Sequence, residues 1–327
     1  MFKRQFLQAA AATFAVPLAA TPFAAFAAEV YPSRPIKLVV TFPPGGASDL
    51  MARIFGLKFG EAIGQTVIID NHPGAAGALG TEYTAHQPAD GYTFMIGNMG
   101  PTIVNPLITK VPYDMAKDFT PVSLIATGPV VMVVNGNSPY KTLKEFIAGA
   151  KAKAGGFNFG SGGAGTLAHL TGEMMNRSAG LNMQHVPYKG GIQALNDVLA
   201  GQLDMLAADV QPVVQHIRSG KLRALAVSSP QRFALLPDVP TYVESGMPDI
   251  VALNSWGVFL PAGVPKADQA VFRKALDKAM VDPELVKKFA ELGVDALHTS
   301  APELLKFNDA ERAKYGKLIK EKNIKAE

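Results

Sequence analysis

The sequence of 327 residues contains no cysteine. Without cysteine the chain forms no disulfide bonds, so its core must be large enough to be stable without cross-links. The same absence excludes a lipid attached to an N-terminal cysteine. A chain of this length and composition, without low-complexity tracts, is typical of a globular protein with two domains.

Charge and long apolar runs are also scarce. The formal net charge is only +4, and no basic stripe is interleaved with aromatic residues, which argues against a nucleic-acid partner. Beyond the N-terminal segment, no apolar stretch is long enough to cross a membrane. We therefore expect the mature protein to be soluble.

The N-terminus carries the pattern of an export signal. The basic pair Lys3-Arg4 precedes an Ala-rich apolar stretch over residues 9–24, which ends at the small-x-small site Ala25-Phe26-Ala27. Residues 1–27 are therefore predicted to be a signal peptide cleaved near Ala27, which places the mature protein in the periplasm. An uncleaved membrane anchor is the alternative. The basic pair resembles a twin-arginine signal with lysine in the first place, so the export route stays open.

Strand-like and helix-like patterns alternate from residue 36 onward. Such alternation favours a parallel sheet, in which ligands bind beyond the carboxyl ends of the strands. The first helix is expected to bury a stripe formed by Leu50, Ile54 and Leu57. The strands predicted in this first series are 36–42, 67–69 and 94–96.

A second series begins after a turn cluster at 135–139, which is a hinge candidate. A later strand near 256–260 and terminal helices, the last opened by Ser300-Ala301-Pro302-Glu303, suggest that the chain returns to the first domain. The strands predicted in the second series are 157–159, 183–186, 203–207 and 222–227. We predict two lobes joined by two crossings, with lobe 1 formed by 28–134 plus 253–327 and lobe 2 by 135–252.

Three glycine-rich turns, at 41–49, 71–77 and 159–166, follow predicted strands and precede helices. Each should leave unpaired backbone N–H groups at a helix N-terminus, where the helix dipole adds positive charge. Such a turn binds small anions without a charged side chain. In the first turn, the glycines allow close approach of a ligand, and Ser48 or Asp49 is the expected N-cap.

The third turn also matches the dinucleotide-binding pattern G-x-G-x-x-G at Gly160, Gly162 and Gly165. The ribose of a dinucleotide needs an acidic residue at the end of the next strand, and residues 183–186 contain none. A carboxylate pocket is the better interpretation, with the hydroxyls of Ser161 and Thr166 and the backbone N–H groups as donors. Glycines that serve only close packing are the alternative.

Further polar candidates lie beyond other predicted strands. Asn98 and Met99 follow the third strand, and Lys189 lies in another strand-to-helix turn. Asp209 could accept a ligand hydroxyl or amino group, or it could simply cap a helix. His169 lies one helical turn beyond the third glycine-rich turn and could reach the mouth of a pocket.

No catalytic or metal-binding arrangement accompanies the turns. Ser161 lacks the nucleophile elbow because Phe159 takes the place of its first glycine. The six histidines are scattered without metal-ligand spacing. We expect no enzymatic activity, no cofactor and no metal.

Several short motifs follow one another along the whole of the predicted mature chain. They are Tyr31-Pro32-Ser33-Arg34-Pro35-Ile36, the turns 43–49 and 71–77, Val111-Pro112-Tyr113-Asp114, Asp118-Phe119-Thr120-Pro121-Val122, Phe159-Gly160-Ser161-Gly162, His185-Val186-Pro187-Tyr188-Lys189-Gly190, Leu222-Arg223-Ala224-Leu225-Ala226-Val227 and Leu236-Pro237-Asp238-Val239-Pro240-Thr241. In this order they resemble the Bug (Bordetella uptake gene) family, the extracytoplasmic receptors of tripartite tricarboxylate transporters.

The resemblance implies a two-lobed α/β periplasmic binding protein of type II, the Venus-flytrap fold, with a parallel-rich sheet in each lobe. It also implies a small carboxylate ligand and the membrane permease subunits of a tripartite tricarboxylate transporter as partners. We expect a monomer. In the family, the turns matching 42–49 and 160–166 and the one after Tyr188 hold the ligand. The candidate ligand-binding residues are Phe42, Gly45, Gly46, Ala47, Ser48, Asp49, Asn98, Met99, Gly160, Ser161, Thr166, His169, Tyr188, Lys189 and Asp209.

Two departures from relatives border the expected cleft. Ala207-Ala208 stand where many relatives carry Phe-Asp, and Ser255-Trp256 stand where relatives often have Trp followed by an aromatic residue. These departures leave the identity of the carboxylate open. Two other functions also stay open, namely a sensory receptor acting with a sensor kinase and an exported nucleotide-binding enzyme.

Overall fold

Ten strands form the framework of the computed structural model, which describes residues 30–325. The strand order is β2-β1-β3-β9-β4-β7-β5-β6, and β8 and β10, which lie off this path, both pair with β4. The predicted signal peptide, residues 1–27, lies outside the described residues. From Tyr31 onward the chain forms one compact unit, in which the sheet is mixed: the outer strands are parallel, and the pairs that involve β4 or β9 are antiparallel.

The first series of strands and helices builds one half of this unit. Its strands β1 and β2 run parallel from the pair Ile36 and Val67, and β3 pairs parallel with β1. The elements of this half up to the shared strand are β1 (Ile36–Val40), α1 (Ala47–Ile63), β2 (Val67–Asn71), η1 (Ala75–Gly77), α2 (Ala78–Ala85), β3 (Thr93–Asn98), η2 (Gly100–Val104) and α3 (Asn105–Ile108). The predicted strands of the first series are confirmed within a few residues.

The second series builds the other half in the same way. Strand β5 pairs parallel with β6 and with β7, whereas β7 and β8 pair antiparallel with β4. The elements are α4 (Leu143–Ala152), β5 (Asn158–Ser161), α5 (Leu167–Ala179), β6 (Gln184–Pro187), α6 (Gly191–Leu199), β7 (Met205–Asp209), α7 (Val210–Arg218) and β8 (Leu222–Val227). Each predicted strand of the second series is present.

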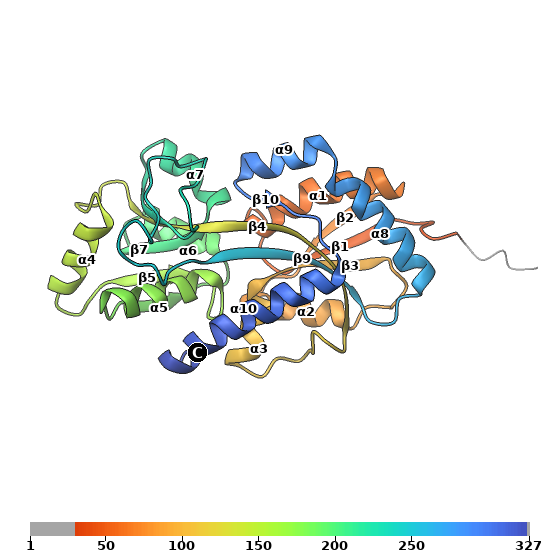
Figure 1. Cartoon of the computed structure of the whole chain (residues 1–327), viewed down its shortest axis with the longest axis horizontal. Coiled ribbons are helices and arrows are strands. Elements are labelled where there is room, and N and C mark those ends of the chain that lie inside the picture. Colours follow the sequence, from red (N-terminus) through yellow and green to blue (C-terminus); the bar gives the residue numbers. More distant parts are fainter. Residues whose placement is uncertain (1–29, 326–327) are drawn as a thin grey trace, which may run out of the picture. The chain divides into compact units, whose positions relative to one another are not determined.

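Strand β4 (Phe119–Asn135) belongs to both halves. Up to Pro129 it pairs with β9 (Leu253–Pro261), and from Val130 onward it pairs with β7 and β8. The change of partner therefore lies several residues before the hinge candidate at 135–139, which forms the turn that ends β4. Figure 1 shows β4 and β9 running side by side between the two halves.

Ser228 ties the two connecting segments together where β4 changes partner. Its side chain is fully buried, and its Oγ accepts a hydrogen bond from the backbone N–H of Val130 at 3.0 Å and donates to the carbonyl of Ala252. Its backbone N–H donates to the carbonyl of Val130 at 2.9 Å, and its carbonyl accepts from Ala252 at 3.0 Å. The boundaries of the two lobes stay a prediction, but the segments between the halves are held at this point.

Helices cover both faces of the sheet, and the buried face of α1 differs from the expected one. Leu57 is 56% exposed, whereas Met51, Phe55 and Phe59 are fully buried. The rings of Phe55 and Phe59 pack with those of Phe94 and Phe272. Of the predicted stripe, Ile54 is partly buried and packs against this core, whereas Leu57 lies outside it, because Phe55 and Phe59 supply the buried face instead.

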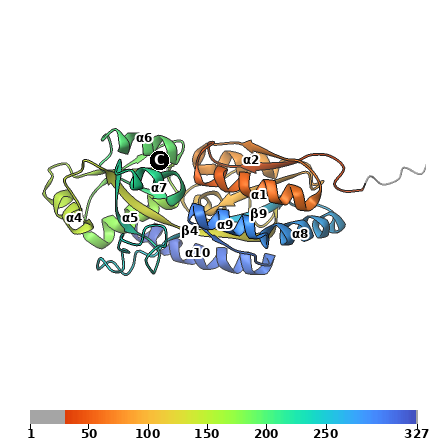
Figure 2. The ribbon, with the colours of Figure 1, turned by 90° about the horizontal axis from the view of Figure 1, so that it is seen from above.

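The C-terminal helices close the first half and reach the second. The remaining elements are α8 (Lys266–Met280), α9 (Pro283–Leu292), β10 (Asp295–Ala296) and α10 (Ala301–Lys322). Helix α10 begins with the predicted capping box, in which Ser300 and Glu303 each bond the other's backbone N–H. It contributes Leu304 to the core of the first half and Tyr315 and Leu318 to that of the second. Figures 1 and 2 both show α10 alongside β4.

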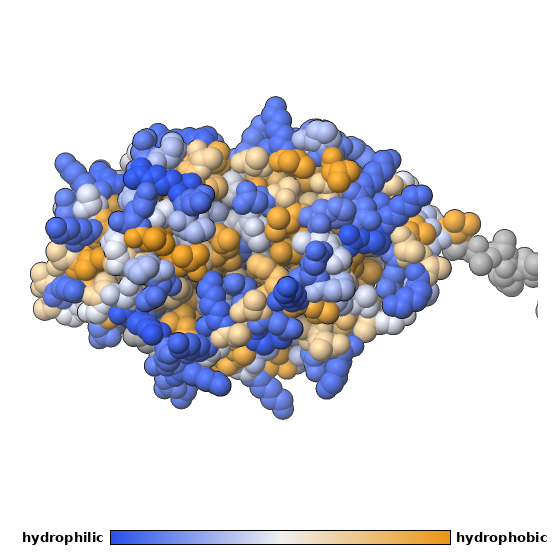
Figure 3. All heavy atoms as spheres, viewed as in Figure 1, coloured by the Kyte–Doolittle hydropathy of each residue, from blue (hydrophilic) through white to orange (hydrophobic). Residues whose placement is uncertain are grey.

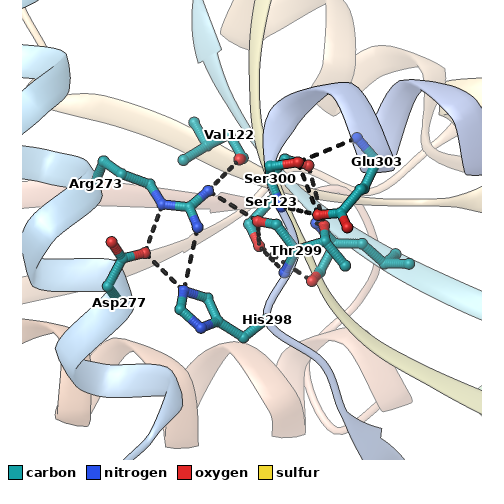
Figure 4. A network of polar contacts seen from close by, with 9 residues as sticks. Val122, Ser123, Arg273, Asp277, His298, Thr299, Ser300 and Glu303 are labelled. Carbon is teal, nitrogen blue, oxygen red and sulfur yellow. Dashed lines mark hydrogen bonds and ion pairs between the residues drawn. The ribbon is translucent and has the colours of Figure 1, made fainter.

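A polar network anchors α8 and α10 to the start of β4 (Figure 4). The guanidinium of Arg273 donates to the carbonyls of Val122 at 2.9 Å and Thr299 at 2.8 Å, and it also pairs with Asp277. Ser123 Oγ donates to the same Thr299 carbonyl at 2.9 Å. Arg273 therefore joins three segments that are far apart in sequence.

The surface of this unit is mixed in character. On the face seen in Figure 3, hydrophobic residues are interspersed with hydrophilic ones. Large apolar side chains that are strongly exposed, such as Leu57, Ile68 and Val281, lie on different elements. Among the described residues, no helix has the length and apolar character needed to span a membrane.

We predict that Arg273→Met lowers the free energy of unfolding by about 1–3 kcal/mol, because the carbonyls of Val122 and Thr299 lose a charged donor. Urea unfolding followed by circular dichroism measures this change. Arg312→Met is the matched control, since among the described residues Arg312 pairs with Asp309 alone, on the surface, and its effect should stay within about 0.5 kcal/mol. Equal effects of the two variants would show that the network does not stabilise the fold.

Candidate functional site

A cavity of about 80 Å³ lies beyond the carboxyl ends of strands from both halves. The N-termini of α1, α5, α6 and α7 all reach its wall, because each of these helices follows a strand that ends there. The first half contributes Phe42, Pro43, Gly46, Ala47, Ser48, Asn98 and Asn254, and the second contributes Gly162, Thr166, Leu167, Ala168, Gly191, Ile192, Leu195, Leu206, Ala207, Ala208, Asp209, Pro212 and Val213. A cavity therefore lies at the strand ends where a site is expected, and ligand binding there stays a prediction.

The turn before α1 presents backbone donors to this cavity. Gly46 occupies the N-cap position with an extended backbone and no side-chain cap, so the expected caps Ser48 and Asp49 were wrong. Within the described part of the chain, the backbone N–H groups of Ala47 and Ser48 have no acceptor. Ser48 Oγ accepts a hydrogen bond from Trp256 Nε1 at 2.9 Å, which leaves its own proton available.

Asp49 stabilises this turn from the side away from the cavity. It is 2% exposed, and its carboxylate accepts hydrogen bonds from Gly45 N–H at 2.9 Å, from Asn71 Nδ2, and from Nε and Nη2 of Arg53. Burial alone would raise the pKa of Asp49, but the bonds from Arg53, Gly45 and Asn71 outweigh it and lower that pKa. The charge of Asp49 is therefore paired inside the turn, and Asp49, which was also a candidate ligand-binding residue, does not line the cavity.

The turn before α5 also presents backbone donors, but its hydroxyls are already used. Thr166 caps the helix by accepting from His169 N–H and donates to the carbonyl of Gly163 at 2.8 Å. Ser161 is fully buried and bonds to the same carbonyl at 3.0 Å. The expectation that both hydroxyls donate to a ligand is therefore not met. Leu167 and Ala168 have backbone N–H groups without an acceptor among the described residues.

His169 packs behind the turn and does not reach the cavity. Its ring stacks on that of His185 at 3.9 Å between centroids, and its Nδ1 accepts from Gly165 N–H at 3.2 Å. Burial, with a smaller contribution from His185, lowers the pKa of His169 to about 3, and burial lowers that of His185 to about 4. Both rings are neutral at physiological pH and support the turn.

Asp209 and Asn254 form the polar pair of the cavity wall. Asn254 is 4% exposed and donates from Nδ2 to Asp209 Oδ1 at 2.9 Å. Burial raises the pKa of Asp209 to about 6, against the smaller opposing effect of the bond from Asn254. Asn98 is 8% exposed, and its Oδ1 has no hydrogen-bond partner. Within residues 30–325, no group of three or more acidic or histidine side chains is placed to hold a metal ion.

The candidate residues fall into three groups. Those that line the cavity are Phe42, Gly46, Ala47, Ser48, Asn98, Thr166 and Asp209. Those that lie beside or beneath its turns without lining it are Gly45, Asp49, Met99, Gly160, Ser161 and His169. Tyr188 and Lys189 line a separate groove with residues 75–79, and the Tyr188 hydroxyl bonds Asp197 at 2.5 Å.

Sequence reasoning missed Asn254 and the apolar wall. The wall consists largely of Val130, Ile192, Leu195, Leu206 and Val213. Ile192 directly follows the Gly190-Gly191 turn, so the sequence of that turn could have indicated that Ile192 lies near the site. Asn254 lies at the start of β9 without any motif, and only the pairing of β9 with β4 brings it near Asp209.

Comparison with known proteins shows the family of this chain. Residues 51–324 match the tripartite tricarboxylate transporter family receptors. The chain belongs to this family. BugT of Bordetella pertussis is 34% identical over 303 residues, which cover 91% of this chain and 92% of BugT. The predicted membership of the Bug family is therefore confirmed.

Solved structures of similar proteins share the fold, among them the periplasmic binding protein BugD, which is 30% identical with a TM-score of 0.84 over 91% of this chain and 100% of that one. Rpa4515 of R. palustris, solved with adipate, is 30% identical with a TM-score of 0.87 over 90% of this chain and 99% of that one. MatC of Rhodopseudomonas palustris, solved with malate, is 28% identical with a TM-score of 0.83 over 88% and 100%. The predicted two-lobed periplasmic binding protein fold is thus confirmed.

The two halves of this receptor touch near the cavity. A Cβ placed on Gly190 would lie 2.6 Å from Cγ of Pro43, and one on Gly163 would lie 3.3 Å from Cβ of Ala76. Both glycines belong to the second half, and both neighbours belong to the first. The structure therefore shows the halves in a closed arrangement, with glycines where the approach is tightest.

Proposed function

We propose that this protein is a periplasmic receptor that captures a small organic carboxylate and delivers it to the permease of a tripartite tricarboxylate transporter. One observation carries the proposal: helix N-termini from both halves meet in one cavity whose described lining contains no lysine or arginine. Each N-terminus is equivalent to about half a positive charge, so several together favour one bound anion.

Binding follows from the free backbone donors. A carboxylate oxygen that replaces water on the N–H groups of Ala47 and Ser48 gains charge-assisted hydrogen bonds in a poorly solvated space. The N–H groups of Leu167 and Ala168 offer the same contacts from the other half. A ligand that bonds both turns favours the closed arrangement, because only there are both sets of contacts made.

Similar proteins support this chemistry. The structures of Rpa4515 with adipate and MatC with malate hold small carboxylates in the same fold. Export through cleavage near Ala27, delivery to permease subunits and a monomeric state are parts of the proposal that come from the sequence. We also propose that the protein has no catalytic activity. The cavity offers backbone donors for an anion, and the histidines His169 and His185 lie behind its wall.

We predict that a small carboxylate raises the melting temperature of the mature protein in a thermal-shift screen. A ligand at 100 times its dissociation constant adds about 2.7 kcal/mol of stability. The panel should include mono- and dicarboxylates, hydroxy acids and amino acids of increasing length, with the corresponding neutral amides as controls. Stabilisation by amides and carboxylates alike, or by none of the acids, would contradict the proposal.

We further predict that Gly190→Ala weakens binding of the stabilising carboxylate by about 1–3 kcal/mol, as over-packing does. The backbone of Gly190 is extended, with φ at 175°, so alanine fits the fold and its methyl group meets Pro43 only on closure. Titration calorimetry measures the affinity. Gly316→Ala is the matched control, because no atom lies within 4 Å of its Cβ position. Unchanged affinity in Gly190→Ala would show that ligand binding does not need this closed contact.

A further inference from the structure

The cavity contains one ionisable side chain, and it is acidic. Among the described residues that line it, Asp209 alone can carry a charge. Its Oδ1 accepts from Asn254, whereas no donor of the described chain reaches its Oδ2. Asp209 stands at the N-cap position of α7 but makes no side-chain capping bond. Oδ2 is therefore an unused acceptor at the wall of the site.

The surroundings of Asp209 oppose further negative charge. Burial raises its pKa to about 6, so the carboxylate is mostly ionised at neutral pH although the cavity disfavours its charge. Arg53 of α1 forms an ion pair with Asp49 outside the cavity. A second carboxylate of a ligand would thus share a small space with an anion and meet no cationic side chain.

Asn98, which also lines the cavity, carries a second acceptor without a partner. Asn98 is more than nine-tenths buried, and its Oδ1 has no partner. A buried acceptor without a donor costs free energy that a ligand N–H or O–H recovers. Between these polar groups the wall is apolar, with Val130, Leu195 and Val213 among its residues.

We propose that the ligand of this receptor has a single carboxylate and, across an apolar carbon chain, an O–H or N–H donor for Asp209 and Asn98. The carboxylate binds the backbone donors of α1 and α5, and the donor group satisfies the unused acceptors. This inference rests on the proposed carboxylate-binding function. Rpa4515 and MatC were solved with the dicarboxylates adipate and malate, whereas in this receptor Asp209 would repel the second carboxylate of such a ligand.

Two matched ligand series test the inference by calorimetry on ligand-free mature protein. One is adipate, 6-hydroxyhexanoate, 6-aminohexanoate and hexanoate, and the other is succinate, 4-hydroxybutyrate, 4-aminobutyrate and butyrate. In the series that fits the cavity, we expect the hydroxy or amino acid to bind roughly tenfold or more tightly than the dicarboxylate. The hydroxy and amino members distinguish a neutral from a cationic donor.

Asp209→Asn keeps the shape of the side chain and removes its charge. In this variant we expect dicarboxylate binding to strengthen roughly tenfold or more and amino-acid binding to weaken. The preference for the hydroxy or amino acid over the dicarboxylate should then be lost or reversed. Binding of the plain monocarboxylate should stay unchanged, which also shows that the variant is folded. Asp238→Asn removes the same charge from an exposed position and should alter none of these affinities.

The outcomes separate the two proposals. If the dicarboxylate binds the unmodified protein as tightly as its hydroxy and amino analogues, and Asp209→Asn does not change this, the single-carboxylate inference is overturned while the receptor function stands. If folded protein binds no member of either series and no carboxylate in the thermal-shift screen, the proposed function fails and the inference fails with it.

Discussion

The continuity of β4 through both halves is the constraint on which the structure depends. This one strand pairs with β9 up to Pro129 and with β7 and β8 from Val130 onward, so it belongs to both halves of the sheet. Ser228 fixes the two connecting segments at the change of partner. Because the outer strands of both sheets then end toward the same space, the helices that follow them direct their N-termini into one cavity.

This arrangement supports the proposed binding of a carboxylate without a cationic side chain. We propose as donors the backbone N–H groups that the helix geometry leaves unpaired in both halves, and the turns that carry them are held by internal bonds. Asp49 with Arg53 supports the first turn, and the stacked pair of His169 and His185 supports the second. The other ionisable residues near the turns stabilise them, whereas Asp209 and Asn98 line the cavity, where we propose that they restrict which ligands bind.

Much of the fold could be predicted from local pattern, because strand alternation, glycine turns and caps such as Ser300 with Glu303 are determined within a few residues. The turns that carry the backbone donors could be predicted for the same reason. The partners of Ser161 and Thr166 could not, since both hydroxyls bond a carbonyl, that of Gly163, in a conformation that only the folded turn defines. Asn254 could not be found either, because it reaches Asp209 only through the pairing of β4 with strands far away in the sequence.

The central claim is that backbone donors from both halves bind the carboxylate, and amide chemical shifts test it most directly. In a titration of isotope-labelled protein with a stabilising carboxylate, the ¹⁵N–¹H signals of Ala47, Ser48, Leu167 and Ala168 should move downfield and saturate together, as expected for N–H groups that gain a charged acceptor. Shifts confined to one half, or centred on the groove that contains Tyr188 and Lys189, would contradict the claim.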